Sequence, residues 1–135
     1  MKRLAVLGML IPALALALVG VAQAKSPLYG VYQVTIKGSA AQLNGTWQIS
    51  FAPNGAYVVV KAPNTKTMLI GGSSSTSGAT VKMTDKTGPA ACTGNTATAK
   101  YKWSLSGKSL KLTKVKDACA PRAVILATGP LTKVR

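Results

Sequence analysis

Apolar and polar residues alternate through most of the chain after residue 25, and clusters of Gly, Pro, Asn and Ser interrupt the alternation about every ten positions. A two-residue period is typical of β-strands with one buried face, and no segment sustains the 3.6-residue period of an amphipathic helix. We predict strands at residues 28–37, 45–52, 56–61, 67–71, 79–85 and 96–105, a seventh around 110–116 and an eighth at 122–128, before a basic tail that follows Pro130.

Turn residues mark two hairpins most clearly. Pro53, Asn54 and Gly55 separate the second strand from the third, and Ser106 with Gly107 separates the sixth from the seventh. The Gly- and Ser-rich residues 71–78 fit either a polar strand with a turn or a flexible loop, and we favour the strand. Eight short antiparallel strands with one apolar face each must close or stack, and sequential hairpins favour an up-and-down barrel.

The first 24 residues have the features of a secretory signal peptide. Lys2 and Arg3 precede an apolar run over residues 4–21, and Ala22-Gln23-Ala24 forms a small-x-small cleavage site. The alternative is an uncleaved membrane anchor, since the run is near the lower length limit for a span. We expect cleavage after Ala24 and one β-barrel domain over residues 25–135, exported to the periplasm or medium as a monomer without a transmembrane segment.

Two cysteines, Cys92 and Cys119, are predicted to form one disulfide, because an even cysteine count in an exported chain usually means pairing. A metal site needs more soft ligands than two, and the chain has no His. We therefore expect neither a metal nor a cofactor.

The segment Leu43-Asn44-Gly45-Thr46-Trp47 resembles the Gly-x-Trp opening of lipocalin-like and avidin-type calycin barrels. The segment from Tyr101 to Leu105, with Asp117-Ala118-Cys119 and Arg122, is similar to small exported bacterial proteins described as lipocalin-like. This resemblance implies an eight-stranded barrel with Trp47 at its floor. It also implies an arginine from the final strand over the indole, for which Arg122 is a better match than Arg135.

Catalysis is not expected, because the chain has no His and no Glu, and only Asp85 and Asp117 as acids. We predict that Asp117 pairs with Arg122 and fixes the disulfide loop. Ser73, Ser74 and Ser75 lack the Gly-Lys-Ser/Thr ending and helix of a phosphate loop, so they are expected in a polar edge or turn. The aromatic residues of the buried faces either line a ligand cavity or pack as ordinary core, and these are Tyr57, Tyr101 and Trp103.

The charge is extreme. Lys2 and Arg3 leave with the signal peptide, so 15 of the 17 basic residues face two acids, a side-chain charge of +13. We expect a noncatalytic lipocalin-like barrel that binds a small apolar ligand or has a structural role. The alternative is a cationic surface protein that binds polyanions such as acidic polysaccharide, lipid head groups or extracellular DNA. Adaptation to an acidic medium explains the scarcity of carboxylates equally well. Aromatics confined to apolar faces argue against specific nucleic-acid binding.

Overall fold

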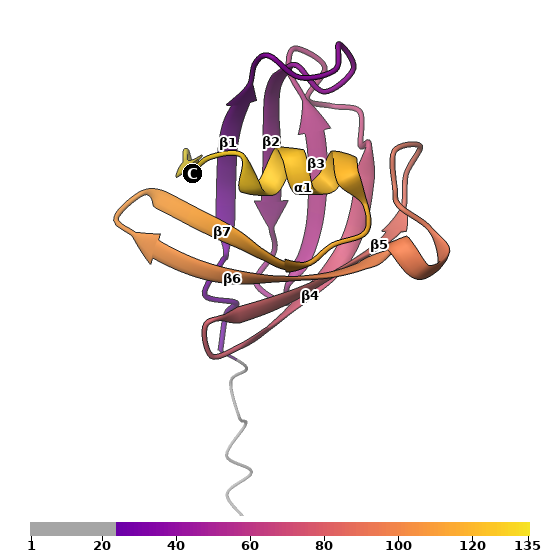
Figure 1. The fold of residues 1–135 in the computed structure, drawn as a ribbon. Coiled ribbons are helices and arrows are strands. Elements are labelled where there is room, and N and C mark those ends of the chain that lie inside the picture. Colours follow the sequence, from indigo (N-terminus) through magenta and orange to yellow (C-terminus); the bar gives the residue numbers. More distant parts are fainter. Residues whose placement is uncertain (1–23) are drawn as a thin grey trace, which may run out of the picture.

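The computed structural model describes residues 24–135, so nearly all of the predicted signal peptide, residues 1–23, lies outside the described part. In the described part, eight antiparallel strands close into one barrel in chain order, which confirms the predicted all-β architecture (Figure 1). The strands are β1 (Gly30–Ile36), β2 (Gly45–Phe51), β3 (Ala56–Lys61), β4 (Ile70–Ser77), β5 (Thr80–Thr87), β6 (Thr98–Ser106), β7 (Ser109–Lys116) and β8 (Leu131–Lys133).

The alternation in the sequence decides which side chains enter the barrel. In β2, Trp47, Ile49 and Phe51 are buried, while the two polar residues between them are half-buried. Because successive side chains of a strand point to opposite faces, each strand contributes apolar residues to one interior core. One member from each strand, in order, is Ile36, Ile49, Val59, Ile70, Met83, Ala99, Leu110 and Leu131.

The prediction for the C-terminal segment was wrong. Residues 122–128, predicted as the eighth strand, belong to the helix α1 (Ala120–Ala127), and the basic tail after Pro130 contains the true eighth strand, β8. Pro121 occupies the first turn, where its fixed φ and missing N–H favour a helix. The short apolar run fits both periods, so periodicity alone does not separate helix from strand there.

Helix α1 packs across the end of the barrel at which β1, β3, β5 and β7 finish. Its buried residues Arg122, Ile125 and Leu126 have helical spacing and lie on one face. Ile125 and Leu126 join the core. Arg122 is also buried, and its guanidinium donates to the carbonyl of Ala97, directly before β6.

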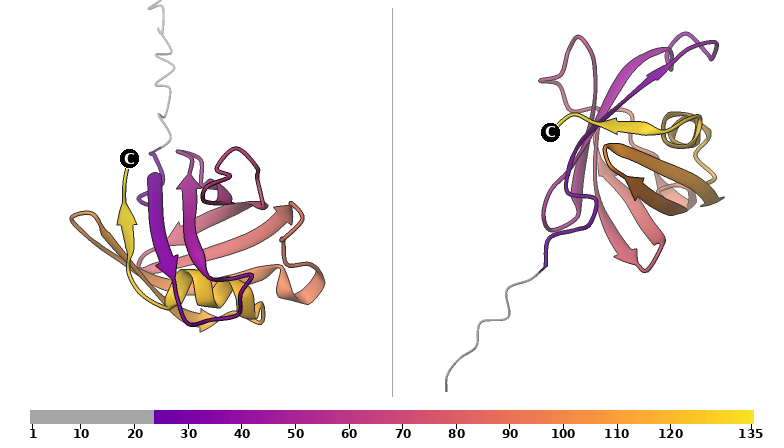
Figure 2. Two further views of the ribbon diagram at one scale, coloured as in Figure 1. Left: turned by 90° about the horizontal axis from the view of Figure 1, so that it is seen from above. Right: turned by 90° about the vertical axis from the view of Figure 1, so that its left-hand side faces the viewer.

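The Gly- and Ser-rich segment forms β4, as favoured, and turns into β5 at Gly78, whose φ is +55°. Barrel closure depends on β8, which pairs with β1 through Tyr32 and Gln33 and with β7 through Ser109 and Leu110. The backbone of Val31 also bonds Arg135, so β8 and the C-terminus lie beside β1 (Figure 2). No helix of residues 24–135 is long and apolar enough to cross a membrane.

The disulfide between Cys92 and Cys119 is present, as predicted, with 6.3 Å between the Cα atoms. It joins the connection between β5 and β6 to the start of α1. A loop of this size, 27 residues apart in sequence, is expected to stabilise the fold by roughly 3.5 kcal/mol through the reduced entropy of the unfolded chain.

Candidate functional site

Five polar side chains meet inside the barrel, and we call them the buried polar cluster. Arg122 comes from α1, Asp85 from β5 and Asp117 from the residue after β7, while Tyr57 of β3 and Tyr101 of β6 complete it. Both carboxylate side chains are fully covered, and Arg122 is 4% exposed. The predicted pairing of Asp117 with Arg122 is therefore part of a larger network.

Arg122 uses its whole guanidinium within this cluster. Its Nε and Nη2 donate to the two carboxylate oxygens of Asp117, at 2.9 and 2.8 Å. Its Nη1 and Nη2 donate to the backbone carbonyls of Ala97 and Thr96, each at 2.8 Å, and Nη1 lies 3.2 Å from Asp85. Four of the five N–H groups of the guanidinium thus donate hydrogen bonds, and the remaining contact is the ion pair with Asp85. A buried arginine with two carboxylate partners avoids the large cost of an unpaired charge.

The two carboxylates have parallel surroundings. Asp85 accepts the Tyr57 hydroxyl at 2.6 Å and the backbone N–H of Cys92 at 2.9 Å. Asp117 accepts the Tyr101 hydroxyl and the backbone N–H of Cys119, the latter at 2.8 Å. Each acid thus holds one tyrosine and one disulfide cysteine. Two negative charges share one guanidinium here, and each carboxylate also accepts hydrogen bonds from two neutral donors.

Gly72 allows Tyr57 to reach Asp85. Tyr57, Gly72 and Asp85 stand opposite one another on β3, β4 and β5. A Cβ added at Gly72 would lie 2.5 Å from the Tyr57 ring and 2.2 Å from the carbonyl oxygen of Thr84. The tyrosine ring therefore crosses the space above the glycine to reach the next strand, a close approach that only glycine permits.

The cluster shifts the protonation equilibria of its members. Burial tends to raise the pKa of Asp117, but hydrogen bonds from Arg122, Tyr101 and the Cys119 amide outweigh it and hold the pKa below its usual 3.8. Burial, with hydrogen bonds to the carboxylates, raises the pKa of both Tyr57 and Tyr101 well above 10. Burial tends to lower the pKa of Arg122, but the bond to Asp117 reverses this and raises it. The phenols remain neutral and the ion pair remains charged at neutral pH.

The charge of the protein surface follows from the burial of both acids. Asp85 and Asp117 are the only acids of the chain, and both are enclosed. Of the 17 Lys and Arg residues, Lys2 and Arg3 precede the described part and Arg122 is buried, which leaves 14 with exposed or half-exposed side chains. The surface of residues 24–135 therefore carries 14 cationic side chains and no acidic side chain.

The aromatic residues predicted as cavity lining or core have separate environments. Tyr57 and Tyr101 are 2% and 0% exposed, and their hydroxyls are bonded to Asp85 and Asp117. Trp103 is half-buried at the edge of the core, and its indole N–H donates to the carbonyl of Gly78 at 3.1 Å. The structure brings the two tyrosines into one network and leaves Trp103 outside it.

Trp47 stands at the end of the barrel under α1, and its indole N–H donates to the carbonyl of Leu43 at 2.8 Å. Lys61 Nζ lies 5.0 Å from the ring centre, within the range of a cation–π contact. Arg122, expected over this indole from a final strand, instead comes from α1 and directs its guanidinium to the two acids. Lysine thus supplies the cation over the Trp47 ring.

An apolar cavity of about 390 Å³ opens between α1 and this end of the barrel. Trp47, Leu69 and Ile125 line it together with the disulfide, and Lys61 lies at its edge. The volume lies within the range of small-molecule sites, which are mostly apolar with few polar groups. The resemblance placed Trp47 at this end, but the cavity itself depends on α1, which periodicity did not predict.

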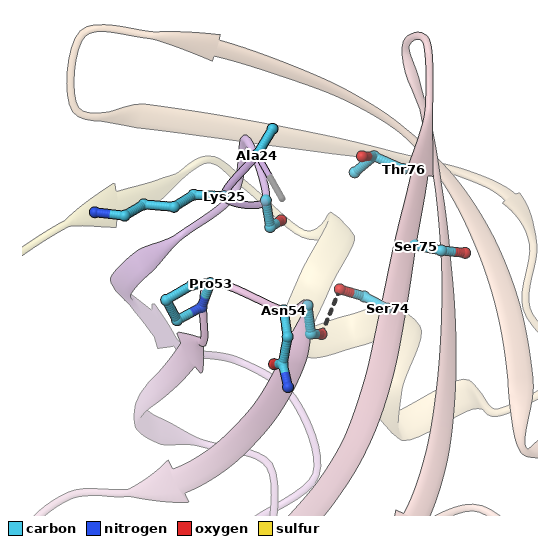
Figure 3. A pocket seen from close by; sticks show the side chains of 9 residues that line it. Ala24, Lys25, Pro53, Asn54, Ser74, Ser75 and Thr76 are labelled. Carbon is cyan, nitrogen blue, oxygen red and sulfur yellow. Dashed lines mark hydrogen bonds between the residues drawn. The ribbon is translucent and has the colours of Figure 1, made fainter. Parts of the chain in front are cut away.

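A second pocket, of about 340 Å³, is more polar and lies between the first described residues and the turn from β2 to β3 (Figure 3). Ser74 Oγ donates to the carbonyl of Gly55 at 2.7 Å, which ties β4 to that turn. Ser75 points away from Ser74 in Figure 3, as alternation along a strand requires. The serines are therefore residues of β4, which pairs with β3 and β5 inside the closed barrel, and they lie neither in an edge strand nor in a turn.

No protein-family model, curated protein or solved structure matches the chain. Within residues 24–135, no three His, Cys, Asp or Glu side chains group as metal ligands. The functional interpretation therefore rests on the geometry of this chain alone.

Sequence reasoning identified Asp117 with Arg122 but missed Asp85 as a second partner, and it assigned no polar role to the two tyrosines. One signal was present. Each cysteine follows an aspartate closely, Cys92 after Asp85 and Cys119 after Asp117. In the structure that spacing lets each carboxylate accept the backbone N–H of its own cysteine.

Proposed function

We propose that this protein is a noncatalytic β-barrel that binds polyanions through its surface. The observation that carries the proposal is the enclosure of both acids, which leaves the described surface with cations and no carboxylate side chain. Such a surface attracts polyanions by electrostatics and by release of their condensed counterions. The buried cluster supports a noncatalytic role, because its titratable groups bond one another and only Arg122 of the cluster lines the apolar cavity.

Retention on immobilised heparin tests this function, with neutral dextran as the control matrix. We expect the protein of residues 25–135 to bind heparin at about 150 mM salt, the physiological ionic strength, and to elute steeply as salt rises. Binding to dextran is expected to be absent. Flow-through on heparin even at about 50 mM salt, where counterion release favours binding, would contradict the proposal. Adaptation to acid alone predicts no retention at the higher salt.

Export is part of the proposal. The disulfide supports it, because such bonds persist mainly in oxidising compartments. A place among small lipocalin-like barrels is supported by the closed eight-stranded sheet and by the position of Trp47 at one end.

A second candidate function is the binding of a small apolar ligand, and the cavity beside Trp47 favours it. The chain has two tryptophans, so Trp103→Phe leaves Trp47 as the only indole reporter. We expect the dye 1-anilinonaphthalene-8-sulfonate to quench Trp47 with saturation in this variant. Ala90→Phe, at an exposed lining residue, should fill part of the cavity without adding an indole and should reduce the effect. Unchanged quenching after Ala90→Phe would place the dye elsewhere.

A further inference from the structure

Three lysines form a row across the outer face of the sheet. Lys82 on β5 stands opposite Lys100 on β6, and Lys100 stands opposite Lys116 on β7. All three are exposed, while the residues that flank Lys82 and Lys100 in their strands are buried. We call these three residues the lysine row. Neighbouring strands are about 4.8 Å apart, so the row spans roughly 10 Å perpendicular to the strands.

A β-bulge brings the third lysine into the row. From Leu112, opposite Trp103, the register runs to Lys114, opposite Tyr101. An unbroken ladder would next place Val115 opposite Lys100, but the register shifts by one residue and Lys116 takes that position. Val115 is left 53% exposed as the extra residue. Bulges of this kind redirect side chains at functional positions.

The lysine row is unfavourable for the isolated protein. Like charges directly opposite one another on a sheet repel and lower stability. No acidic side chain of the described surface offsets this repulsion, since both acids are enclosed in the barrel. An anionic chain laid along the row would remove the repulsion and release counterions at once.

The positions around the row carry hydroxyls. Ser75 on β4 stands opposite Lys82 and continues the lysine row onto that strand. Thr84 and Thr98 form a neighbouring pair with 3.1 Å between their hydroxyl oxygens, and on the other side Lys102 stands between Thr80 and Thr113. The face thus combines point charges with groups that donate and accept hydrogen bonds.

We propose that the lysine row is the main contact for a linear acidic polysaccharide, which deepens the proposed polyanion binding and rests on it. Sulfates or carboxylates would meet the lysines, and sugar hydroxyls would meet the flanking serine and threonines. Single-stranded nucleic acid fits less well, because bases need aromatic stacking platforms and Trp103 points toward the core. A lipid surface also fits less well, because exposed Val115 is a single apolar side chain beside the row and membrane insertion needs a larger apolar face.

The test compares two triple variants with equal loss of charge. The row variant carries Lys82→Gln, Lys100→Gln and Lys116→Gln. The control variant carries Lys37→Gln, Lys66→Gln and Lys108→Gln. These lysines are exposed and lie directly after β1, in the β3–β4 connection and in the β6–β7 turn. Binding of a fluorescein-labelled heparin octasaccharide is followed by anisotropy between about 50 and 300 mM salt, where counterion release is strong.

We expect the row variant to bind about tenfold or more weakly at ~100 mM salt and to lose about two to three units of salt slope. The control variant should lose less than about threefold. Equal losses in the two variants would overturn the lysine row while leaving polyanion binding intact. No binding by the wild type would overturn the proposed function itself. Tighter binding of a single-stranded DNA of equal charge would assign the row to nucleic acid.

Folding of the variants is checked by their unfolding midpoints. Removal of like charges should raise the midpoint of the row variant, because the repulsion is relieved. The single change Lys100→Gln at the centre of the row provides a second measurement. It should weaken octasaccharide binding more than Lys37→Gln does, and equal effects would also contradict the inference.

Discussion

The tyrosines inside the barrel differ in what their hydroxyls contact. Tyr57 and Tyr101 donate to carboxylates, whereas the fully buried hydroxyl of Tyr32 has no hydrogen-bond partner among the described residues. The ring of Tyr32 packs edge-on against Phe51, with 6.0 Å between the ring centres. Tyr32 therefore contributes to the stability of the fold through the packing of its ring and not through its hydroxyl oxygen.

This contrast gives a matched series of Tyr→Phe changes. Tyr57→Phe and Tyr101→Phe should each lower the free energy of unfolding by about 1.5–3 kcal/mol, the usual value of a hydrogen bond to a charged group. Tyr32→Phe should be neutral or slightly stabilising, because it removes an unpaired polar atom. Urea unfolding of the three variants measures this. Equal losses at all three positions would mean that the buried cluster contributes little.

The lowered pKa of Asp117 predicts the effect of acid. A group whose pKa is lower in the folded state contributes stability that is complete above its unfolded value, about 3.9, and is lost as pH falls through the folded value. The free energy of unfolding should therefore stay level with respect to Asp117 from pH 7 to about 5 and decline below about 4.

Urea unfolding at fixed ionic strength measures this profile. Asp117→Asn should be less stable at pH 7, because Arg122 loses one of its two charged partners, and should depend less on pH below about 4. A wild-type protein that loses stability between pH 7 and 5 would contradict the assignment of the acid response to Asp117.

At the scale of elements, β4 shows how a weak strand sequence can be required by its neighbours. Gly71 and Gly72 lower intrinsic strand propensity, yet the ring of Tyr57 occupies the space over Gly72. The glycine is explained by the side chain of Tyr57, the second residue of the neighbouring strand β3. Local sequence patterns contain no information about that contact.

We expect Gly72→Ala to displace Tyr57 from Asp85, because the new methyl group would meet both the ring and the Thr84 carbonyl. Its cost in unfolding free energy should exceed that of Tyr57→Phe, since it adds overpacking to the lost hydrogen bond. In the double variant with Tyr57→Phe the two losses should be less than additive, because both act on one contact. Full additivity in this cycle would show that the two residues act independently.

Elements with clear alternation could be predicted closely. Residues 56–61 match β3 at both ends, and 45–52 exceed β2 by one residue, because buried positions alternate with less buried ones along most of each strand. Helix α1 could not be predicted, since a short apolar run has the same composition in a helix or a strand. Asp85 was missed for a related reason, because its partner Arg122 is 37 positions away and reaches it only through that helix.

For the whole molecule, the separation of charge between interior and surface is the dominant feature. The acids and one arginine lie inside, and the remaining described cations repel one another around the barrel. Self-repulsion of this kind destabilises a compact state and is screened by salt. Polyanion binding and stability should therefore respond to salt in opposite directions.

We expect the thermal unfolding midpoint to rise as NaCl increases from about 20 to 500 mM, where the screening length falls below the spacing of surface charges. The row variant lacks three closely spaced lysines, so its unfolding midpoint should rise less with salt. Differential scanning calorimetry at neutral pH provides the measurement. A midpoint that is independent of salt in both proteins would show that the surface charges are too far apart to interact.

Strand β8 has a consequence for the time at which the molecule can assemble. Its three residues pair with β1, about a hundred positions earlier, and with β7 on the other side of α1. Until residues 131–133 are free to pair, β1 and β7 both present unpaired edges, which are prone to pair with other chains. During synthesis the barrel therefore cannot close before residues 131–133 have left the ribosome and are free to pair with β1 and β7.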